Sequence, residues 1–200
     1  MLFLRDKRSL TSLSSDPIAS SLINRFSSSV LHDYVSECRS LKTELAESAE
    51  LAAIVKQEAI VPDCIVDVGC GHGLLSLGVA SKLEVPRVCW VDRDESCRAA
   101  RFANALDVKF CSCVEQVVLS DKATLILVVN LCSQSLLDVI EWYKRDAMHG
   151  SWMLCVPCCG PEGIDYPAWL NHVECELGIA QCLRIQLENN LKRVAIVHKK

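Results

Sequence analysis

The chain of 200 residues contains no run of 18 apolar residues and no hydrophobic segment of the secretory-signal type. A membrane span and an oxidising compartment are therefore not expected. The chain also lacks an excess of positive charge, because its net charge is -4 and its pI is about 5.7. Such a protein has no global attraction to nucleic acid or to anionic membranes, so a polyanionic acceptor would need a local basic patch. We predict a cytoplasmic protein with no membrane partner.

Cysteine, by contrast, is abundant, with 13 residues in the chain. Buried cysteine behaves as a small hydrophobic residue, so we expect most of these thiols to be free and to lie in the core. Seven of them lie within or beside apolar runs: Cys64, Cys70, Cys89, Cys111, Cys113, Cys132 and Cys155.

The sequence divides into three parts. Residues 1–30 are rich in serine and low in acids, and we predict a flexible tail there with one helix from Pro17 to Phe26. The bias toward serine and basic residues also fits a mitochondrial transit peptide, which leaves a mitochondrial location as the alternative. Residues 31–60 form an amphipathic helical extension, and residues 61–200 form one globular domain.

The helical extension is predicted from its periodicity between Leu31 and Ala59. Leu41, Leu45 and Val55 share one helical face, while charged residues occupy the others, and the helix should end before Pro62. We expect its apolar face to lie against the following domain. The same helix is also a candidate docking surface for a protein partner.

Beyond residue 60, short apolar runs alternate with helical patterns, which predicts a parallel sheet covered by helices on both faces. The end of the chain departs from this rhythm, because two strand-like runs separated by a short polar turn predict an antiparallel hairpin. The expected strands are 65–68, 87–91, 109–113, 125–130, 152–156, 181–187 and 193–198, and the expected helices are 74–83, 96–106 and 136–147.

Three glycines follow the first strand of this pattern, at Gly69, Gly71 and Gly73. Glycines at a strand-to-helix turn allow a ligand to approach the main chain closely. A dinucleotide-binding turn would have its third glycine at Leu74, so a nicotinamide-dependent oxidoreductase is disfavoured. Asp67 lies two residues before the turn, where a carboxylate suits an ammonium group better than a pyrophosphate. S-adenosylmethionine carries that ammonium group on a nucleoside.

A ribose-binding acid is expected at the end of the second strand, and Asp92 lies 21 positions after Gly71. Asp94 is a second candidate, although a helix N-cap is the preferred interpretation of that residue. "VDVGCGHG" together with Asp92 resembles motifs I and II of the class I S-adenosylmethionine-dependent methyltransferases. The resemblance implies an α/β, Rossmann-like, seven-stranded methyltransferase sheet with a terminal antiparallel hairpin. The cofactor-binding residues that it implies are Asp67, Gly69, Cys70, Gly71, His72, Gly73, Asp92, Arg93, Glu115 and Asn130.

A second resemblance covers "VNLCSQSLLDVIEWYKRDAMHGSWMLCVPCCG". This segment is similar to the methyltransferase-like domain of the glutathione S-transferase C-terminal-domain-containing protein and to related putative RNA methyltransferases. The stretch from Pro157 to Gly160 matches the proline-cysteine-cysteine motif of that group, and Cys132 matches the cysteine of an earlier motif. Asn130 stands where histidine is usual, and Ser133 where glycine is usual. The resemblance favours RNA as the methyl acceptor.

Asn130 and Cys158 are the candidate catalytic residues on the acceptor side. Asn130 can orient an acceptor, or it can cap the next helix and tie the loop. The loop lacks the Asn/Asp-Pro-Pro-aromatic signature of base amine methylation. Cys158 and Cys159 fit a nucleophile, a metal site or loop packing, of which packing is favoured, because adjacent cysteines are a poor pair of zinc ligands. Cys155 and Cys158 have C-x2-C spacing, but Cys155 belongs to a strand, so we predict no metal.

Two functions of different classes follow. The first is an S-adenosylmethionine-dependent methyltransferase, with the acceptor unknown and RNA slightly favoured. The second is a non-catalytic methyltransferase-like module that acts as an interaction or assembly factor, since a fold does not dictate a function. A small basic group near the end of the chain is interpreted as solvated strand ends, with RNA contact as the alternative: Lys192, Arg193, Lys199 and Lys200.

Overall fold

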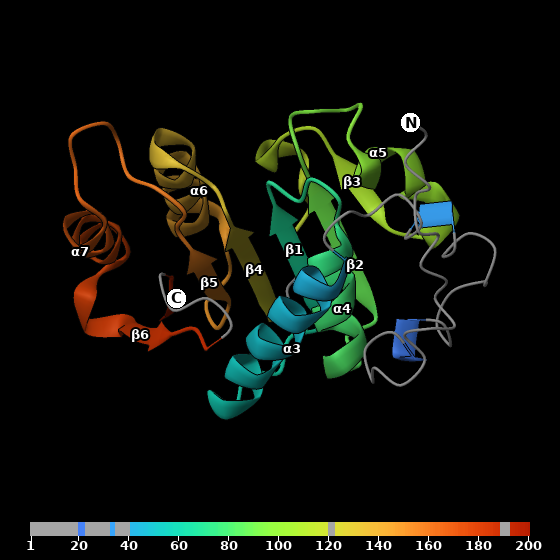
Figure 1. The fold of residues 1–200 in the computed structure, drawn as a ribbon, viewed down its shortest axis with the longest axis horizontal. Helices are drawn as coiled ribbons and strands as arrows, with labels where there is room; N and C mark the ends of the chain where they lie inside the picture. The colour runs from blue at the N-terminus through green and yellow to red at the C-terminus, as the bar shows by residue number, and fades with distance from the viewer. Residues whose placement is uncertain (1–19, 23–32, 35–40, 120–122, 189–192) are drawn as a thin grey trace, which may run out of the picture.

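The computed structural model describes residues 20–22, 33–34, 41–119, 123–188 and 193–200. The predicted helix from Pro17 to Phe26 and the serine-rich tail fall mainly outside these residues. A seven-stranded sheet forms the centre of the domain, in the order β3-β2-β1-β4-β5-β7-β6 (Figure 1). The strands are β1 (Cys64–Val68), β2 (Arg87–Val91), β3 (Lys109–Cys111), β4 (Thr124–Val129), β5 (Trp152–Val156), β6 (Cys182–Gln186) and β7 (Val194–Lys199).

The strand directions confirm the predicted architecture. β1 to β5 pair in parallel, whereas β7 pairs antiparallel with both β5 and β6. β4 follows β3 in the chain but pairs with β1, so the order of the strands reverses between β1 and β4. In doubly wound sheets this reversal opens a crevice at the carboxyl ends of the two strands. The fold therefore presents a ligand site just after Val68 and Val129.

Helices cover both faces of the sheet. α3 and α4 pack on one face, and α6 and α7 pack on the other, each pair around its own hydrophobic cluster (Figure 1). The α-helices are α3 (Leu41–Gln57), α4 (Leu74–Leu83), α5 (Arg98–Phe102), α6 (Ser133–Asp146) and α7 (Tyr166–Leu177), and the 3-10 helices are η2 (Asn104–Leu106), η3 (Val114–Gln116) and η4 (Ile179–Gln181).

The helical extension belongs to the domain. α3 packs along α4, its apolar face is buried, and the Ser48 hydroxyl donates to the carbonyl oxygen of Leu75 at 3.0 Å. The predicted start at Leu31 cannot be compared, because residues 35–40 lie outside the described ones. A protein partner for this helix stays a prediction, and it would have to use the outer face that carries Lys42, Ala53 and Lys56.

Two predicted boundaries were wrong around the third strand. β3 ends at Cys111, and a bend at Ser112 and Cys113 takes the place of the end of the predicted strand before the 3-10 helix η3 begins. The following helix in the prediction was also too long, because α5 begins only at Arg98 and its N-cap is Cys97. The Asp94 carboxylate accepts from the backbone N–H of Ser96 at 2.9 Å, so Asp94 shapes the preceding turn instead of capping the helix.

The cysteines follow the prediction only in part. Cys89, Cys111 and Cys155 are buried free thiols within the sheet, as expected. The prediction of a free thiol was wrong for Cys132, which forms a disulfide with Cys158 across the loops that follow β4 and β5. In the part of the chain that the structure describes, no helix is both long and apolar enough to cross a membrane.

Candidate active site

The glycine turn joins β1 to α4. The backbone N–H of Gly69 donates to the carbonyl oxygen of Val91 at 2.8 Å, and that of Gly73 donates to the carbonyl oxygen of Cys70 at 2.7 Å. Gly69, Gly71 and Gly73 have φ angles of 75°, 50° and 77°. Side chains with a Cβ are strained in this left-handed region, so the path of the turn explains why glycine stands at all three positions.

Two of these glycines have different surroundings. A Cβ added to Gly73 would lie 2.3 Å from Cε2 of Trp90, whereas one added to Gly71 would meet nothing within 4 Å. Trp90 is fully buried, and its indole N–H donates to the Ser76 hydroxyl at 2.9 Å. Gly73 therefore makes room for the core and lines neither of the cavities described below, so its role in cofactor binding stays a prediction. Gly71 leaves open space in front of the main chain.

Asp92 comes directly after β2 and connects the two motifs of the sequence. Its carboxylate accepts from the backbone N–H of Gly71 at 2.8 Å and from that of Asp94 at 2.9 Å. A carboxylate has about four acceptor positions, so it can take further hydrogen bonds beside these two. Asp92 thus holds the glycine turn and keeps acceptor positions free for further hydrogen bonds.

A cavity of about 460 Å³ lies beside Asp92. Of the residues expected to hold the cofactor, Gly69, Asp92, Arg93 and Glu115 line it together. The lining is Val68, Gly69, Val91, Asp92, Arg93, Ser112, Cys113, Val114, Glu115, Leu131, Ser135, Asp138 and Val139. Its walls combine apolar side chains with the carboxylates of the strand ends, which suits a flat apolar group attached to hydroxyl groups.

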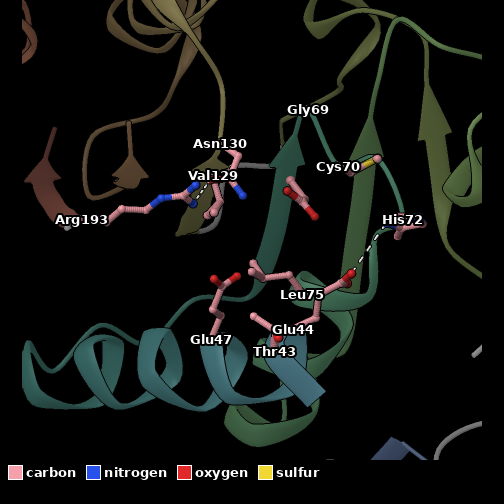
Figure 2. Close-up of a pocket in the computed structure, with 12 residues that line it drawn as sticks. Thr43, Glu44, Glu47, Gly69, Cys70, His72, Leu75, Val129, Asn130 and Arg193 are labelled. Carbon is pink, nitrogen blue, oxygen red and sulfur yellow. Dashed lines mark hydrogen bonds and ion pairs between the residues drawn. The ribbon is translucent and has the colours of Figure 1, made fainter. Parts of the chain in front are cut away.

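A second cavity of about 350 Å³ lies on the α3 side of the turn (Figure 2). Gly69 lines both cavities. Six of the expected cofactor residues converge on it: Asp67, Gly69, Cys70, Gly71, His72 and Asn130. The other lining residues are Thr43, Glu44, Glu47, Leu75, Val129 and Arg193. The two cavities therefore meet at the glycine turn, one on each side of it.

Asp67 is a buried carboxylic acid in the second cavity, with 4% of its surface exposed. Burial raises its pKa from 3.8 to about 7, and the negative charges of Asp92 and Glu44 act in the same direction. A hydrogen bond with Ser76 opposes this shift only in part. A cationic group that enters the cavity would stabilise the ionised form of Asp67.

Sequence reasoning missed the residues that α3 and the terminal hairpin contribute. Figure 2 shows Glu44 and Glu47 rising from α3 toward the turn, with Arg193 on the opposite side. Burial raises the pKa of Glu47, although the positive charge of Arg193 lowers it. Glu44 lies 3.6 Å from the His72 imidazole, measured from Oε1 to Nδ1. The helical periodicity places both acids away from the apolar face of the helix, and Arg193 was interpreted as part of a solvated strand end.

The two candidate catalytic residues are placed differently. Asn130 lines the second cavity in a left-handed conformation, with φ of 64°, and its side-chain oxygen accepts from the Arg193 guanidinium. Cys158 does not line that cavity. Its sulfur lies 3.5 Å from the Asn130 carbonyl oxygen and is bonded to Cys132, so in this form it is not a thiolate nucleophile.

Tyr34 also contacts the glycine turn, although no pattern in the sequence indicated this contact. Its hydroxyl donates to the carbonyl oxygen of His72 at 2.5 Å, and its ring stacks on Trp90 with centroids 6.2 Å apart. Tyr34 therefore fixes the glycine turn from the core side.

Comparison with known proteins identifies the fold. No protein-family model matches the sequence, and no curated protein matches it. The structure resembles the ribosomal protein L11 methylase of Lactobacillus delbrueckii subsp. bulgaricus, with a TM-score of 0.54 and 23% identity over 76% of this chain and 78% of the other. For a putative O-methyltransferase of Nostoc punctiforme the TM-score is 0.58, with 15% identity over 96% and 69% of the two chains.

A tRNA methyltransferase of B. subtilis gives a TM-score of 0.53, with 12% identity over 74% of this chain and 65% of the other. Identities this low establish the fold and leave the acceptor open. The chain has the Rossmann-like fold of the S-adenosylmethionine-dependent methyltransferases.

Proposed function

We propose that the protein is an S-adenosylmethionine-dependent methyltransferase. One observation carries the proposal: two cavities meet at a glycine turn whose central residue, Gly71, leaves its Cβ direction open. Carboxylates line both cavities, among them Asp92 in one and Asp67 in the other. This arrangement matches a ligand with hydroxyl groups at one end and an ammonium group at the other.

The lining residues fit the parts of this cofactor. Asp92 would accept from the ribose hydroxyls, and Val114, Glu115 and Leu131 would border the adenine ring. Asp67 would face the ammonium group in the second cavity. When bound, the cofactor supplies a methyl group on a positively charged sulfur. Phosphate groups are disfavoured here, because acids line both cavities.

The residues of the chain would bind and orient the acceptor on the α3 side. Asn130 and Arg193 form a polar wall there, and the Glu47 carboxylate lies in the same cavity. Because burial raises the pKa of Glu47, its carboxylate is a better proton acceptor than an exposed one. Much of the acceleration in methyl transfer comes from holding the nucleophile in line, and the residues that line the α3-side cavity would serve that purpose.

RNA is the acceptor class that we favour. The segment from Val129 to Gly160 is similar to the methyltransferase-like domain of the glutathione S-transferase C-terminal-domain-containing protein and to putative RNA methyltransferases, and one protein of similar fold methylates tRNA. The carboxylates of Glu44, Glu47 and Asp67 would repel phosphate, so a neutral base would have to enter the cavity while the backbone stays outside.

Calorimetric titration with S-adenosylmethionine tests cofactor binding. We expect micromolar affinity, and Asp92→Ala should weaken it by roughly 10- to 150-fold, since hydrogen bonds to a charged group contribute about 1.5 to 3 kcal/mol. Asp94→Ala is the matched control, because it removes a neighbouring exposed carboxylate that lines neither cavity. Absence of binding at millimolar cofactor would contradict the proposal.

Methyl transfer is tested separately, by incubating the chain with labelled cofactor and either total RNA or total protein. Label in RNA that disappears with Asp92→Ala supports the favoured acceptor, and label in protein alone would refute it. Cofactor binding without transfer to either pool would favour the alternative, a non-catalytic interaction or assembly factor. The departures of Asn130 and Ser133 from the family motif motivate that alternative.

A further inference from the structure

Three cysteine sulfurs gather where the loops after β4 and β5 meet. Cys132 lies at the start of α6, and Cys158 and Cys159 follow β5. The sulfur atoms all lie within 4.8 Å of one another, and those of Cys158 and Cys159 are 3.4 Å apart. The disulfide uses only two of the three, so it leaves a third thiol beside it.

The backbone holds these loops together independently of the sulfur bond. The N–H of Ser133 donates to the carbonyl oxygen of Cys159 at 3.4 Å, and that of Asn130 donates to the carbonyl oxygen of Val156 at 3.1 Å. β4 and β5 are paired up to Val129 and Val156, directly before the loops. After reduction of the disulfide, the three thiols would therefore stay close to one another.

The spacing of the sulfurs suits one metal ion. A tetrahedral zinc site with Zn–S bonds of about 2.3 Å places its sulfurs about 3.8 Å apart. The sulfurs of the adjacent pair, Cys158 and Cys159, lie 3.4 Å apart, close to this value, although adjacent cysteines were judged a poor pair of ligands from the sequence. The sulfurs of Cys132 and Cys158 are bonded to each other and would have to move apart on reduction to share an ion. Cys132 also occupies the N-cap of α6 without a side-chain hydrogen bond to the helix. The partial positive charge of a helix N-terminus favours a thiolate there.

We propose that Cys132, Cys158 and Cys159, in their reduced state, bind Zn²⁺ through three thiolates, with the fourth position open to water or another ligand. The Cys158 sulfur lies 3.5 Å from the carbonyl oxygen of Asn130, a residue that lines the second cavity. The metal would thus fix the loop that carries Asn130. This site is additional to the proposed methyl transfer and does not depend on it.

The disulfide and the zinc site are two states of the same cluster. A dithiol reductant transfers two electrons and two protons to the Cys132–Cys158 bond, which gives two thiols and a cyclic disulfide of the reductant. Zn²⁺ then displaces three protons from the three thiols. Oxidation by a small-molecule disulfide reverses the first step, takes two electrons from the thiolates and releases the ion.

Cobalt titration of the full chain tests this site. The protein is reduced with a dithiol, freed of it by anaerobic gel filtration, and titrated with Co²⁺, whose tetrahedral thiolate complexes absorb in the visible range. We expect one ion per chain, displaced by Zn²⁺. Cys132→Ser, Cys158→Ser and Cys159→Ser should each weaken binding by about 100-fold or more, because each removes a direct ligand.

Cys175→Ser is the matched control, since Cys175 is an exposed thiol in α7 and is not part of the cluster. It should leave the cobalt spectrum and the affinity unchanged. Thermal unfolding of each variant without metal separates loss of the site from loss of the fold. The proposal is overturned if the reduced, folded chain takes up no Co²⁺ at micromolar concentration, or if Cys159→Ser binds it as tightly as the natural chain.

Discussion

The two halves of the candidate site are built in different ways. The cofactor half, around Gly69 and Asp92, takes most of its lining from the stretch between β1 and η3, and Leu131 and residues of α6 complete it. The acceptor half combines α3, the loop after β4 and the start of β7, with Glu47, Asn130 and Arg193 far apart in the sequence. A local motif specifies most of the first half, whereas the residues of the second half come together only after the chain has folded.

This difference decides which substitutions act on stability and which on chemistry. In the cofactor half one residue both holds the turn and lines the cavity, because Asp92 accepts from the backbone N–H of Gly71. In the acceptor half Arg193 is half-exposed and Asn130 is exposed, so these side chains contribute less to the core. Substitutions in the two halves should therefore have separable effects.

The largest effect is expected within the cofactor half, from two glycines with similar backbone conformations. Gly73→Ala should destabilise the fold by roughly 3 to 5 kcal/mol, because a Cβ overlaps the Trp90 ring and the left-handed backbone adds strain. Gly71→Ala, in open space, should cost only about 1 kcal/mol but should block the ligand. Urea unfolding and cofactor titration of both variants measure the two effects. Equal losses of stability would contradict the distinction between them.

The next effect concerns the pH dependence of stability. The pKa of Asp67 is about 7 in the folded chain, above its ordinary value of 3.8, so between these values the folded chain binds more protons than the unfolded chain. The stabilisation is complete below pH 4 and is lost as the pH rises through 7. We expect the free energy of unfolding to fall by roughly 2 to 3 kcal/mol between pH 5 and pH 8.

Urea unfolding at several pH values measures this dependence, with Asp67→Asn as the control that should flatten it. Cofactor affinity should change in the opposite direction, because the ammonium group prefers the ionised carboxylate, and so should tighten between pH 6 and pH 8. A natural chain with the same pH dependence as Asp67→Asn would show that Asp67 is ionised throughout this range.

A smaller effect tests the acceptor half alone. Arg193→Ala should lower kcat/KM for the acceptor by about 3- to 10-fold, since it removes a charged contact with Asn130, while the Kd for the cofactor changes by less than about twofold. The activity profile should also shift to higher pH, because Arg193 lowers the pKa of Glu47. Lys199→Ala, at the other end of β7, is the matched control. If Arg193→Ala also lost affinity for the cofactor, the two halves of the site would not act independently.

The smallest effect is structural and lies outside both cavities. Asp165 caps α7, and its carboxylate accepts from the backbone N–H of Ala168 at 2.8 Å. Asp165→Ala should reduce the free energy of unfolding by about 1 kcal/mol, whereas Asp165→Asn should keep the cap. Chemical denaturation compares the two variants. A change in cofactor affinity in either one would show that α7 communicates with the glycine turn.

The sequence by itself determined the sheet, the glycine turn and the carboxylate that follows β2, Asp92. Alternating apolar runs and helical periods predicted the strands, and Asp67, Gly71 and Asp92 could be found because a glycine turn and the next strand end are neighbours in the chain. Its errors lie at Asp94, Cys97 and β3, where short-range hydrogen bonds set the boundaries of short elements.

Only the tertiary structure decided the acceptor half and the cysteine cluster. From the sequence alone Glu47 is interpreted as an ordinary charged residue of a helix, and only the packing of α3 on α4 places it in the cavity. Cys132 contacts Cys158 because β4 and β5 are adjacent in the sheet. Gly73 shares a motif with Gly71, yet its role follows from the buried Trp90. Local sequence patterns reflect the backbone conformation of neighbouring residues. The burial of a side chain, the charges around it and the grouping of the cysteines depend instead on which distant residues the sheet brings together.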